Sequence, residues 1–150
     1  MRAKIFRWSL LITTLLILQA CTSTKPISKK DQWSFELEKG GCMDVCQAYS
    51  ILIKNNGEYA YTGRFKVKHL GKKNGNIDAQ KMAEFKKLIA DIDWKSLQSA
   101  YDQPGQGSQS KQMKYQSESV LKTITYSQFE PQELRHLENF INTLIDQDDF

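Results

Sequence analysis

In the sequence WSFELE, residues 33–38, apolar and polar side chains alternate one by one. A period of two is typical of a β-strand that buries one face and exposes the other. Gly40 and Gly41 then end the pattern. The stretch therefore predicts a strand in a sheet that is covered on one side, and the rest of the chain must supply its neighbours and its cover.

The following residues predict those neighbouring strands. Residues 49–54 are predicted to form a second strand, and Asn-Asn-Gly at 55–57 supplies the positive φ values that a tight hairpin requires. Residues 58–62 return antiparallel. We expect a further strand at 65–70 and a turn at the Gly- and Asn-rich residues 71–76. The first half of the chain thus predicts a β-meander.

Two helices are predicted to cover this sheet. Asp78 is a suitable N-cap, and apolar residues at helical spacing follow it: Met82, Phe85, Leu88, Ile89 and Ile92. Strands at 112–116 and 120–126 form a later hairpin. Pro131 suits the first position of the last helix, with Phe129 and Leu134 as its hydrophobic staple. The expected fold class is α+β: an antiparallel sheet, meander plus later hairpin, with two amphipathic helices packed against it.

The N-terminus reads as an export signal. Arg2, Lys4 and Arg7 precede an apolar run at residues 8–18, which is too short for the roughly 20 residues of a membrane span. The sequence LQAC at 18–21 resembles the bacterial lipobox. That resemblance implies a diacylglyceryl group on the Cys21 thiol, cleavage before Cys21 and acylation of the new amine. An ordinary cleaved signal and an uncleaved N-terminal anchor are the alternatives.

These features predict the organisation and location of the chain. We expect a lipoprotein signal peptide at 1–20, a flexible tether from lipidated Cys21 at 21–32, a single α+β domain at 33–147 and a frayed tail at 148–150. Thr22 stands where, in Gram-negative lipoproteins, an aspartate favours retention in the inner membrane. The expected location is the bacterial cell envelope, with the protein anchored in the outer membrane and facing the periplasm.

The charge of the mature chain argues against nucleic acid as a partner. The signal removes three of the 21 Lys and Arg residues and none of the 17 Asp and Glu residues, which leaves a net charge of about +1. The lysine pairs at 29–30 and 72–73 are scattered. They are interpreted as solvated loop residues, with contacts to anionic lipid headgroups as the alternative.

Cys42 and Cys46 are spaced C-x-x-x-C in a segment expected to work where thiols are oxidised. Residues four apart in a helical turn have Cα atoms about 6 Å apart, which a disulfide tolerates. We predict a structural disulfide that pins the connection between the first two strands. A redox-active pair is an alternative, and so is a metal site completed by His69 and His136.

Several of these features resemble one family. The segment 42–46, then Tyr49, Asn56-Gly57, Tyr61, Gly63, Val67, Gly71, Gly75 and Ile77, is similar to the bacterial family catalogued as domain of unknown function 6438. The resemblance covers roughly residues 35–145 and is most specific between Cys42 and Ile77. It implies the α+β arrangement described above, and it implies no chemistry because the function of that family is uncharacterised.

Motifs that carry catalysis are absent from the sequence. It contains no G-x-S-x-G, no G-x-x-x-x-G-K and no H-E-x-x-H. We therefore favour a non-enzymatic binding or structural module, held to a membrane by its lipid, with an envelope protein or cell-wall component as partner and with no cofactor. A thiol redox or sensor protein using Cys42 and Cys46 is one alternative. A small envelope hydrolase is the other, and it requires a pocket with two facing carboxylates or a histidine.

Overall fold

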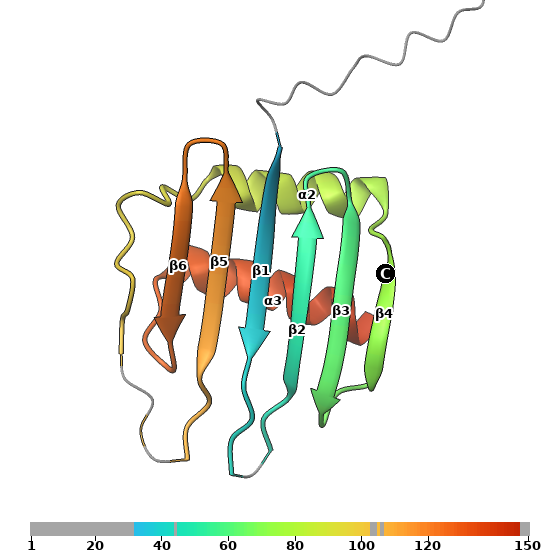
Figure 1. The fold of residues 1–150 in the computed structure, drawn as a ribbon, viewed down its shortest axis with the longest axis vertical. Helices are drawn as coiled ribbons and strands as arrows, with labels where there is room; N and C mark the ends of the chain where they lie inside the picture. Colours follow the sequence, from blue (N-terminus) through green and yellow to red (C-terminus); the bar gives the residue numbers. More distant parts are fainter. Residues whose placement is uncertain (1–31, 44, 103–104, 106, 148–150) are drawn as a thin grey trace, which may run out of the picture.

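The computed structural model describes residues 32–43, 45–102, 105 and 107–147, and they form one antiparallel sheet with two helices on one side (Figure 1). The strands are β1 (Trp33–Lys39), β2 (Ala48–Lys54), β3 (Glu58–Phe65), β4 (Gly71–Asn76), β5 (Lys111–Ser117) and β6 (Leu121–Tyr126). The helices are α2 (Ala79–Ala90) and α3 (Gln132–Gln147). The predicted α+β class is confirmed. Within the described residues, neither helix has the length and apolar character needed to cross a bilayer.

Strand β1 lies in the interior of the sheet, whose order is β4-β3-β2-β1-β5-β6. Phe35 pairs with Ile53 of β2 on one side and with Tyr115 of β5 on the other. The strands β4 to β1 follow each other as a meander, and the β5–β6 hairpin extends the sheet from the other side of β1. Strand β1, whose apolar and polar residues alternate, therefore joins the two parts of the sheet.

The β2–β3 hairpin forms where the Asn-Asn-Gly sequence predicts it. Gly57 has a φ of 91°, a left-handed value that glycine adopts without steric cost. Its amide donates to the Lys54 carbonyl over 2.9 Å, and its own carbonyl accepts from the Ile77 amide over 3.0 Å. The turn thus closes the hairpin and also fixes the start of the segment that leads into α2.

The prediction for the next strand is wrong. The sequence favours a strand at 65–70 and a turn at 71–76, whereas β3 continues to Phe65, residues 66–69 form bends, and β4 occupies Gly71–Asn76. Strand β4 contains two glycines, two asparagines and two lysines, so its own β-propensity is low. Its pairing with β3, from Glu58 opposite Asn76 to Gly63 opposite Gly71, overrides that propensity.

Helices α2 and α3 cross the same side of the sheet, behind it in Figure 1. Asp78 caps α2 as predicted, because its carboxylate accepts from the Gln80 amide over 2.7 Å. The fully buried Phe85 ring lies 5.7 Å from the ring of Phe35 in the sheet and 5.7 Å from the ring of Phe140 in α3. This aromatic contact joins both helices to the sheet, and each fully buried ring contributes about 1.5–3 kcal/mol.

The start of α3 differs from the prediction in two details. Pro131 precedes the helix, since its carbonyl accepts the first intrahelical bond from the Arg135 amide over 3.1 Å. Leu134 is fully buried, but Phe129 is 72 % exposed and forms no hydrophobic staple. The helix is held to the sheet by its own apolar stripe, which continues through Leu137, Ile141, Leu144 and Ile145.

Candidate functional site

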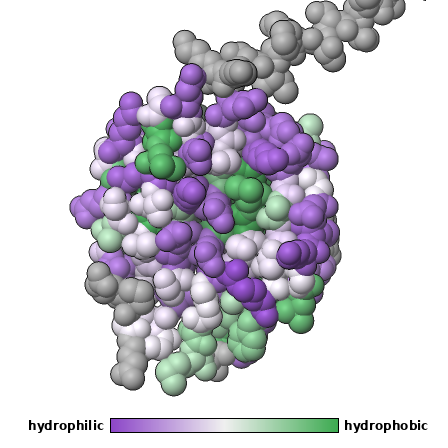
Figure 2. Space-filling model, in the orientation of Figure 1, coloured by the Kyte–Doolittle hydropathy of each residue, from purple (hydrophilic) through white to green (hydrophobic). Residues whose placement is uncertain are grey.

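The side of the sheet opposite the helices is the largest candidate surface for binding. No helix among the described residues covers it, and it faces the viewer in Figure 1. The side chains on this side alternate with the core residues along each strand. They include Ser34, Glu36, Glu38, Ser50, Leu52, Lys54, Thr62, Arg64, Gln112, Lys114 and Gln116. Figure 2 shows hydrophilic residues over much of this side with apolar patches among them, so it offers a partner both polar and apolar contacts.

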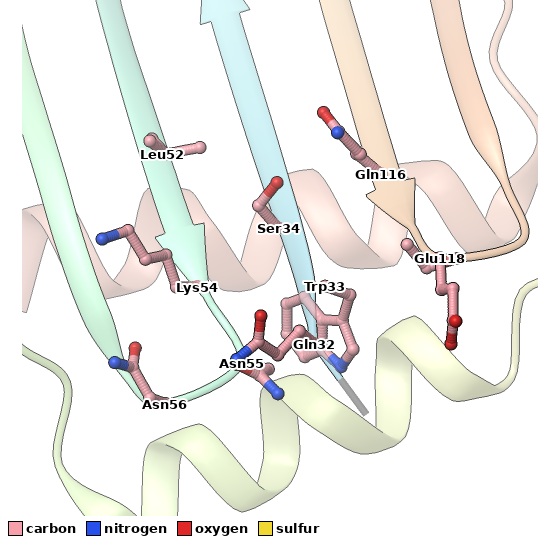
Figure 3. A pocket seen from close by; sticks show the side chains of 10 residues that line it. Gln32, Trp33, Ser34, Leu52, Lys54, Asn55, Asn56, Gln116 and Glu118 are labelled. Carbon is pink, nitrogen blue, oxygen red and sulfur yellow. The ribbon is translucent and has the colours of Figure 1, made fainter. Parts of the chain in front are cut away.

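A hollow of about 650 Å³ opens on this side, at the end of the sheet where β1 begins (Figure 3). It is lined by Gln32, Trp33, Ser34, Leu52, Lys54, Asn55, Asn56, Gln116, Ser117 and Glu118. The β2–β3 hairpin lies on one side of the hollow and the β5–β6 hairpin on the other. Its volume falls in the range of small-molecule sites, which is roughly 300–1,000 Å³.

The lining of this hollow is mostly amides and hydroxyls, with Lys54 and Glu118 as its two charged side chains. The side chains of Gln32, Asn55 and Gln116 each offer both a donor and an acceptor. Leu52 supplies an apolar patch. Trp33 offers only part of its ring, because it also packs on the core side, with ring centroids 6.0 Å from Phe85 and 6.3 Å from Tyr115. Such a lining can bind a neutral ligand rich in hydroxyl or amide groups.

A smaller hollow of about 270 Å³ adjoins the first and shares Leu52 and Lys54 with it. Glu58 lines it as well, and its carboxylate accepts from Lys54 over 2.7 Å. This hydrogen bond is the main reason that the pKa of Glu58 lies below its ordinary value. The carboxylate is therefore ionised at neutral pH, and together with Lys54 it forms an exposed ion pair between the two hollows.

A second polar cluster lies on the opposite side of the sheet, beneath α3. Glu138 forms ion pairs with Lys39 over 3.0 Å and with Lys111 over 3.1 Å. It also accepts a hydrogen bond from the Tyr126 hydroxyl over 2.8 Å. The side chains of Glu138, Lys39 and Lys111 are 8 %, 10 % and 14 % exposed. We call this set, with Tyr126, the buried ion cluster.

The protonation states in this cluster suit a structural role. Burial raises the pKa of Glu138, but the two lysines and the Tyr126 hydroxyl outweigh that effect, so the pKa lies below the ordinary value. Burial raises the pKa of Tyr126, and the negative charge of Glu138 raises it further. The tyrosine is therefore a neutral donor and the glutamate a charged acceptor, which fixes α3 on the end of the sheet.

Sequence reasoning missed this cluster although a signal was present. Lys39 is in phase with Phe35 and Leu37 on the buried side of its strand, and Glu138 follows Leu137 within the apolar stripe of α3. A charged residue in phase with core residues indicates a buried partner of opposite charge. The sequence pattern alone does not show which distant residue that partner is.

The structure contains the Cys42–Cys46 disulfide. Its Cα atoms lie 5.5 Å apart, and the Cys46 amide donates to Cys42 Sγ over 3.2 Å. The bridge lies in the connection between β1 and β2, at the end of the sheet away from the hollow. Cys21, the predicted lipidation site, lies outside the described residues.

The described residues bring together no group of three or more His, Cys, Asp and Glu side chains that could hold a metal ion. His69 lies in the bends between β3 and β4, and its backbone carbonyl accepts from the Tyr61 hydroxyl over 3.1 Å. His136 is on the exposed side of α3, beside a groove of about 320 Å³ that Glu84 also lines. Its ring nitrogen lies 3.4 Å from Gln132 Nε2. The two histidines thus lie in separate places.

The Tyr-x-Gly sequence that contributes to the family resemblance has a packing explanation. A Cβ atom on Gly63 would collide with the His69 carbonyl oxygen and would lie 2.7 Å from the Tyr61 hydroxyl. That hydroxyl and that carbonyl are the two partners of one hydrogen bond. The glycine therefore leaves space for the bond that folds the β3–β4 connection back onto β3, and the motif is structural.

The comparison with known protein families agrees with the resemblance. The family model described as "Domain of unknown function (DUF6438)" matches residues 34–145, which is nearly the whole sheet-and-helix unit. No curated protein matches the sequence.

Proposed function

Because the chain belongs to the DUF6438 family, whose description assigns no activity, we propose a function from this chain's own sequence and fold: a lipid-anchored, periplasm-facing binding module of the bacterial envelope. Its binding surface is the uncovered side of the sheet, and its ligand is an envelope protein or a cell-wall component. In this proposed role the protein binds its ligand and catalyses no reaction.

One observation carries the binding part of this proposal. Among the described residues no helix covers one whole side of the six-stranded sheet, and that side holds the hollow of about 650 Å³ between two hairpins. Its lining offers many hydrogen-bonding groups around the apolar Leu52. Hydrogen-bonding side chains that converge on one place can orient a ligand that is itself polar.

The membrane part of the proposal rests on the sequence alone. Cys21 follows a positive head, a short apolar run and a lipobox-like LQA, and eleven positions separate it from Gln32 on the rim of the hollow. A chain of that length spans about 18 Å as a random coil. A ligand in the hollow would therefore be bound within a few tens of ångströms of the bilayer. This distance is compatible with a protein that binds its ligand at the membrane.

The proposed lipid anchor is tested by mass spectrometry of the protein purified from its native membrane. We expect an N-terminus at Cys21 that carries the mass of a diacylglyceryl group and an acyl chain. Replacing Cys21 with Ser should abolish the added acyl mass, because serine has no thiol to accept the diacylglyceryl group. An intact leader, or an unmodified amino terminus, would refute the lipid anchor.

The binding surface is tested with the unlipidated chain from residue 22, which retains every described core residue between Phe35 and Ile145. The immobilised chain is mixed with purified cell-wall fragments and, separately, with detergent-solubilised envelope proteins. The Leu52→Arg variant should lose most of the retained material, while the matched variant Ala83→Arg, on the exposed side of α2, should retain it. Equal retention by both variants would contradict the proposed surface.

A second candidate function uses the disulfide. The hydrogen bond from the Cys46 amide to Cys42 Sγ would stabilise a thiolate on Cys42 after reduction, and such stabilisation is one way in which a cysteine becomes redox-active. The test is the reduction potential of the pair. A value below about −300 mV marks a structural bond, whereas a higher value supports a thiol redox or sensor role.

A further inference from the structure

The two hollows on the uncovered side of the sheet form one elongated groove. The hollow of about 650 Å³ takes its lining mainly from β5, β1 and β2, and the hollow of about 270 Å³ takes its lining from β2, β3 and β4. They adjoin at Leu52 and Lys54, which line both. These strands are consecutive in the sheet, and neighbouring strands lie about 4.8 Å apart, so the groove crosses them over a length of about 19 Å.

The strand register places two rows of side chains along this groove. Each row consists of cross-strand partners on three neighbouring strands: Gln116, Ser34 and Lys54 in the larger hollow, and Leu52, Ala60 and Asn74 in the smaller one. Figure 3 shows the first row. Because cross-strand partners point to the same side of a sheet, the two rows line one continuous path from β5 to β4.

The groove is nearly neutral. Among the described lining residues, Lys54 is the one basic side chain, and Glu58 and Glu118 are the two acidic ones, so one positive charge stands against two negative charges. Lys54 and Glu58 pair with each other over 2.7 Å near the middle of the path. The amide side chains of Gln116 and Asn74 lie toward its two ends. This lining does not match a strongly charged polymer of either sign.

The backbone beneath the groove is already used by the sheet. Strands β5, β1, β2 and β3 each pair with a neighbour on both sides. An extended peptide that binds a sheet usually does so through main-chain hydrogen bonds at an open edge. A ligand in this groove meets side chains instead, and it must carry its own polar groups along its whole length.

We propose that the groove binds a linear, uncharged oligosaccharide with acetamido groups, which lies across the strands. This inference rests on the proposed binding surface and specifies the class of its ligand. Sugar hydroxyls donate and accept hydrogen bonds, and so do the amides of Gln116 and Asn74 and the hydroxyl of Ser34. A tetrasaccharide has a length comparable to that of the path, whereas a disaccharide fills one hollow.

The middle of the groove suits the acetamido group. Leu52 is half-buried and Ala60 is exposed, and together they offer an apolar patch for its methyl group. The side chains of Lys54 and Glu58 are 53 % and 50 % exposed, so the ion pair remains accessible to ring hydroxyls. The ammonium group donates to such hydroxyls and the carboxylate accepts from them.

The test is isothermal titration calorimetry of the chain from residue 22 with two probes, tetra-N-acetylchitotetraose and di-N-acetylchitobiose. We expect the tetrasaccharide to bind at least about tenfold more tightly than the disaccharide, because only the longer probe occupies both hollows. The inference is overturned if the tetrasaccharide does not bind, or if both probes bind equally. It is also overturned if the deacetylated, cationic tetrasaccharide, or an end-blocked hexapeptide of serine and alanine, binds as tightly as the acetylated tetrasaccharide.

Variants at the two ends of the path test its length. Gln116→Ala and Asn74→Ala should each weaken binding of the tetrasaccharide about threefold to tenfold, the usual effect of one lost hydrogen bond. Gln112→Ala is the matched control, because its side chain lies on the same side of β5 but outside both hollows, and it should bind like the unmodified chain. A loss with Gln116→Ala and none with Asn74→Ala would overturn the elongated groove, and so would an equal loss with Gln112→Ala.

Failure of this inference is distinguishable from failure of the proposed function. If the tetrasaccharide does not bind but Leu52→Arg still loses the envelope material that Ala83→Arg retains, the ligand class is wrong and the binding surface stands. If Leu52→Arg and Ala83→Arg retain the same material, the binding surface itself is wrong.

Discussion

The two sides of the sheet use charged residues in opposite ways. On the covered side, Glu138, Lys39 and Lys111 are almost enclosed and satisfy each other beneath α3. On the uncovered side, Lys54 and Glu58 also form an ion pair, but their side chains are 53 % and 50 % exposed. The charged residues on the covered side fix the position of α3 on the sheet. The charged residues on the uncovered side are accessible to a partner. Substitutions on the two sides should therefore have different effects.

The largest effect is expected from Glu138→Ala. This change leaves two buried lysines without their carboxylate, and breaking a buried pair in this way costs about 3–5 kcal/mol of unfolding free energy. Urea unfolding followed by circular dichroism measures the loss. Glu133→Ala, an exposed position at the start of the same helix, is the control and should change stability by less than about 0.5 kcal/mol. Similar losses in both variants would show that the buried ion cluster is not under the helix as described.

Removing the disulfide should have the next largest effect. A bridge that closes so short a loop restricts the unfolded chain only modestly, so Cys42→Ser/Cys46→Ser should lower the unfolding free energy by about 2 kcal/mol. Both sides of the sheet should remain intact, because the bridge lies in the connection between β1 and β2. A loss of the native circular dichroism spectrum would show instead that the bridge determines the sheet.

A pH effect should follow from the same buried glutamate. The pKa of Glu138 is lower in the folded protein than its ordinary value of 4.5, so the folded state favours the ionised form. Its contribution to stability is complete above that value and is lost as the pH falls through the lower pKa of the folded state. Unfolding free energies measured from pH 6 to pH 3 should therefore fall more steeply for the unmodified chain than for Glu138→Gln. Equal slopes would contradict the depressed pKa.

The smallest effect on stability is expected on the uncovered side. Gln112→Ala and Gln116→Ala remove exposed side chains of β5 that point away from the core, and each should change the unfolding free energy by less than about 0.5 kcal/mol. The same thermal and urea measurements apply. A loss above about 1.5 kcal/mol in either variant would mean that this side is packed against something.

The sequence predicts most of the sheet because β1 alternates strictly and turn residues separate the strands that follow it. The buried side of β1, and the Asn-Asn-Gly turn that ends at Gly57, could be assigned from residue type alone. Strand β4 could not, because its glycines and lysines carry no apolar period and only pairing with β3 makes it a strand.

The candidate surfaces were less accessible to prediction. Alternation shows that one side of β1 is polar, but it does not show that α2 and α3 both pack on the other side. The hollow depends on Gln32, Leu52 and Gln116, which come from separate parts of the chain and meet only in the sheet. The disulfide was predictable because its cysteines are near each other in the sequence. A single sequence does not show which residues that are distant along the chain become neighbours in the fold.

The most direct test of the account is site-specific photocrosslinking of the native protein in intact cells. A photoreactive amino acid is placed at Leu52 on the uncovered side and, in a second strain, at Ala83 on the exposed side of α2. We expect a discrete crosslinked product to an envelope protein or to cell-wall material from position 52 and none from position 83. Crosslinks from position 83 alone, or the same products from both positions, would contradict the claim that the uncovered side of the sheet is the binding surface.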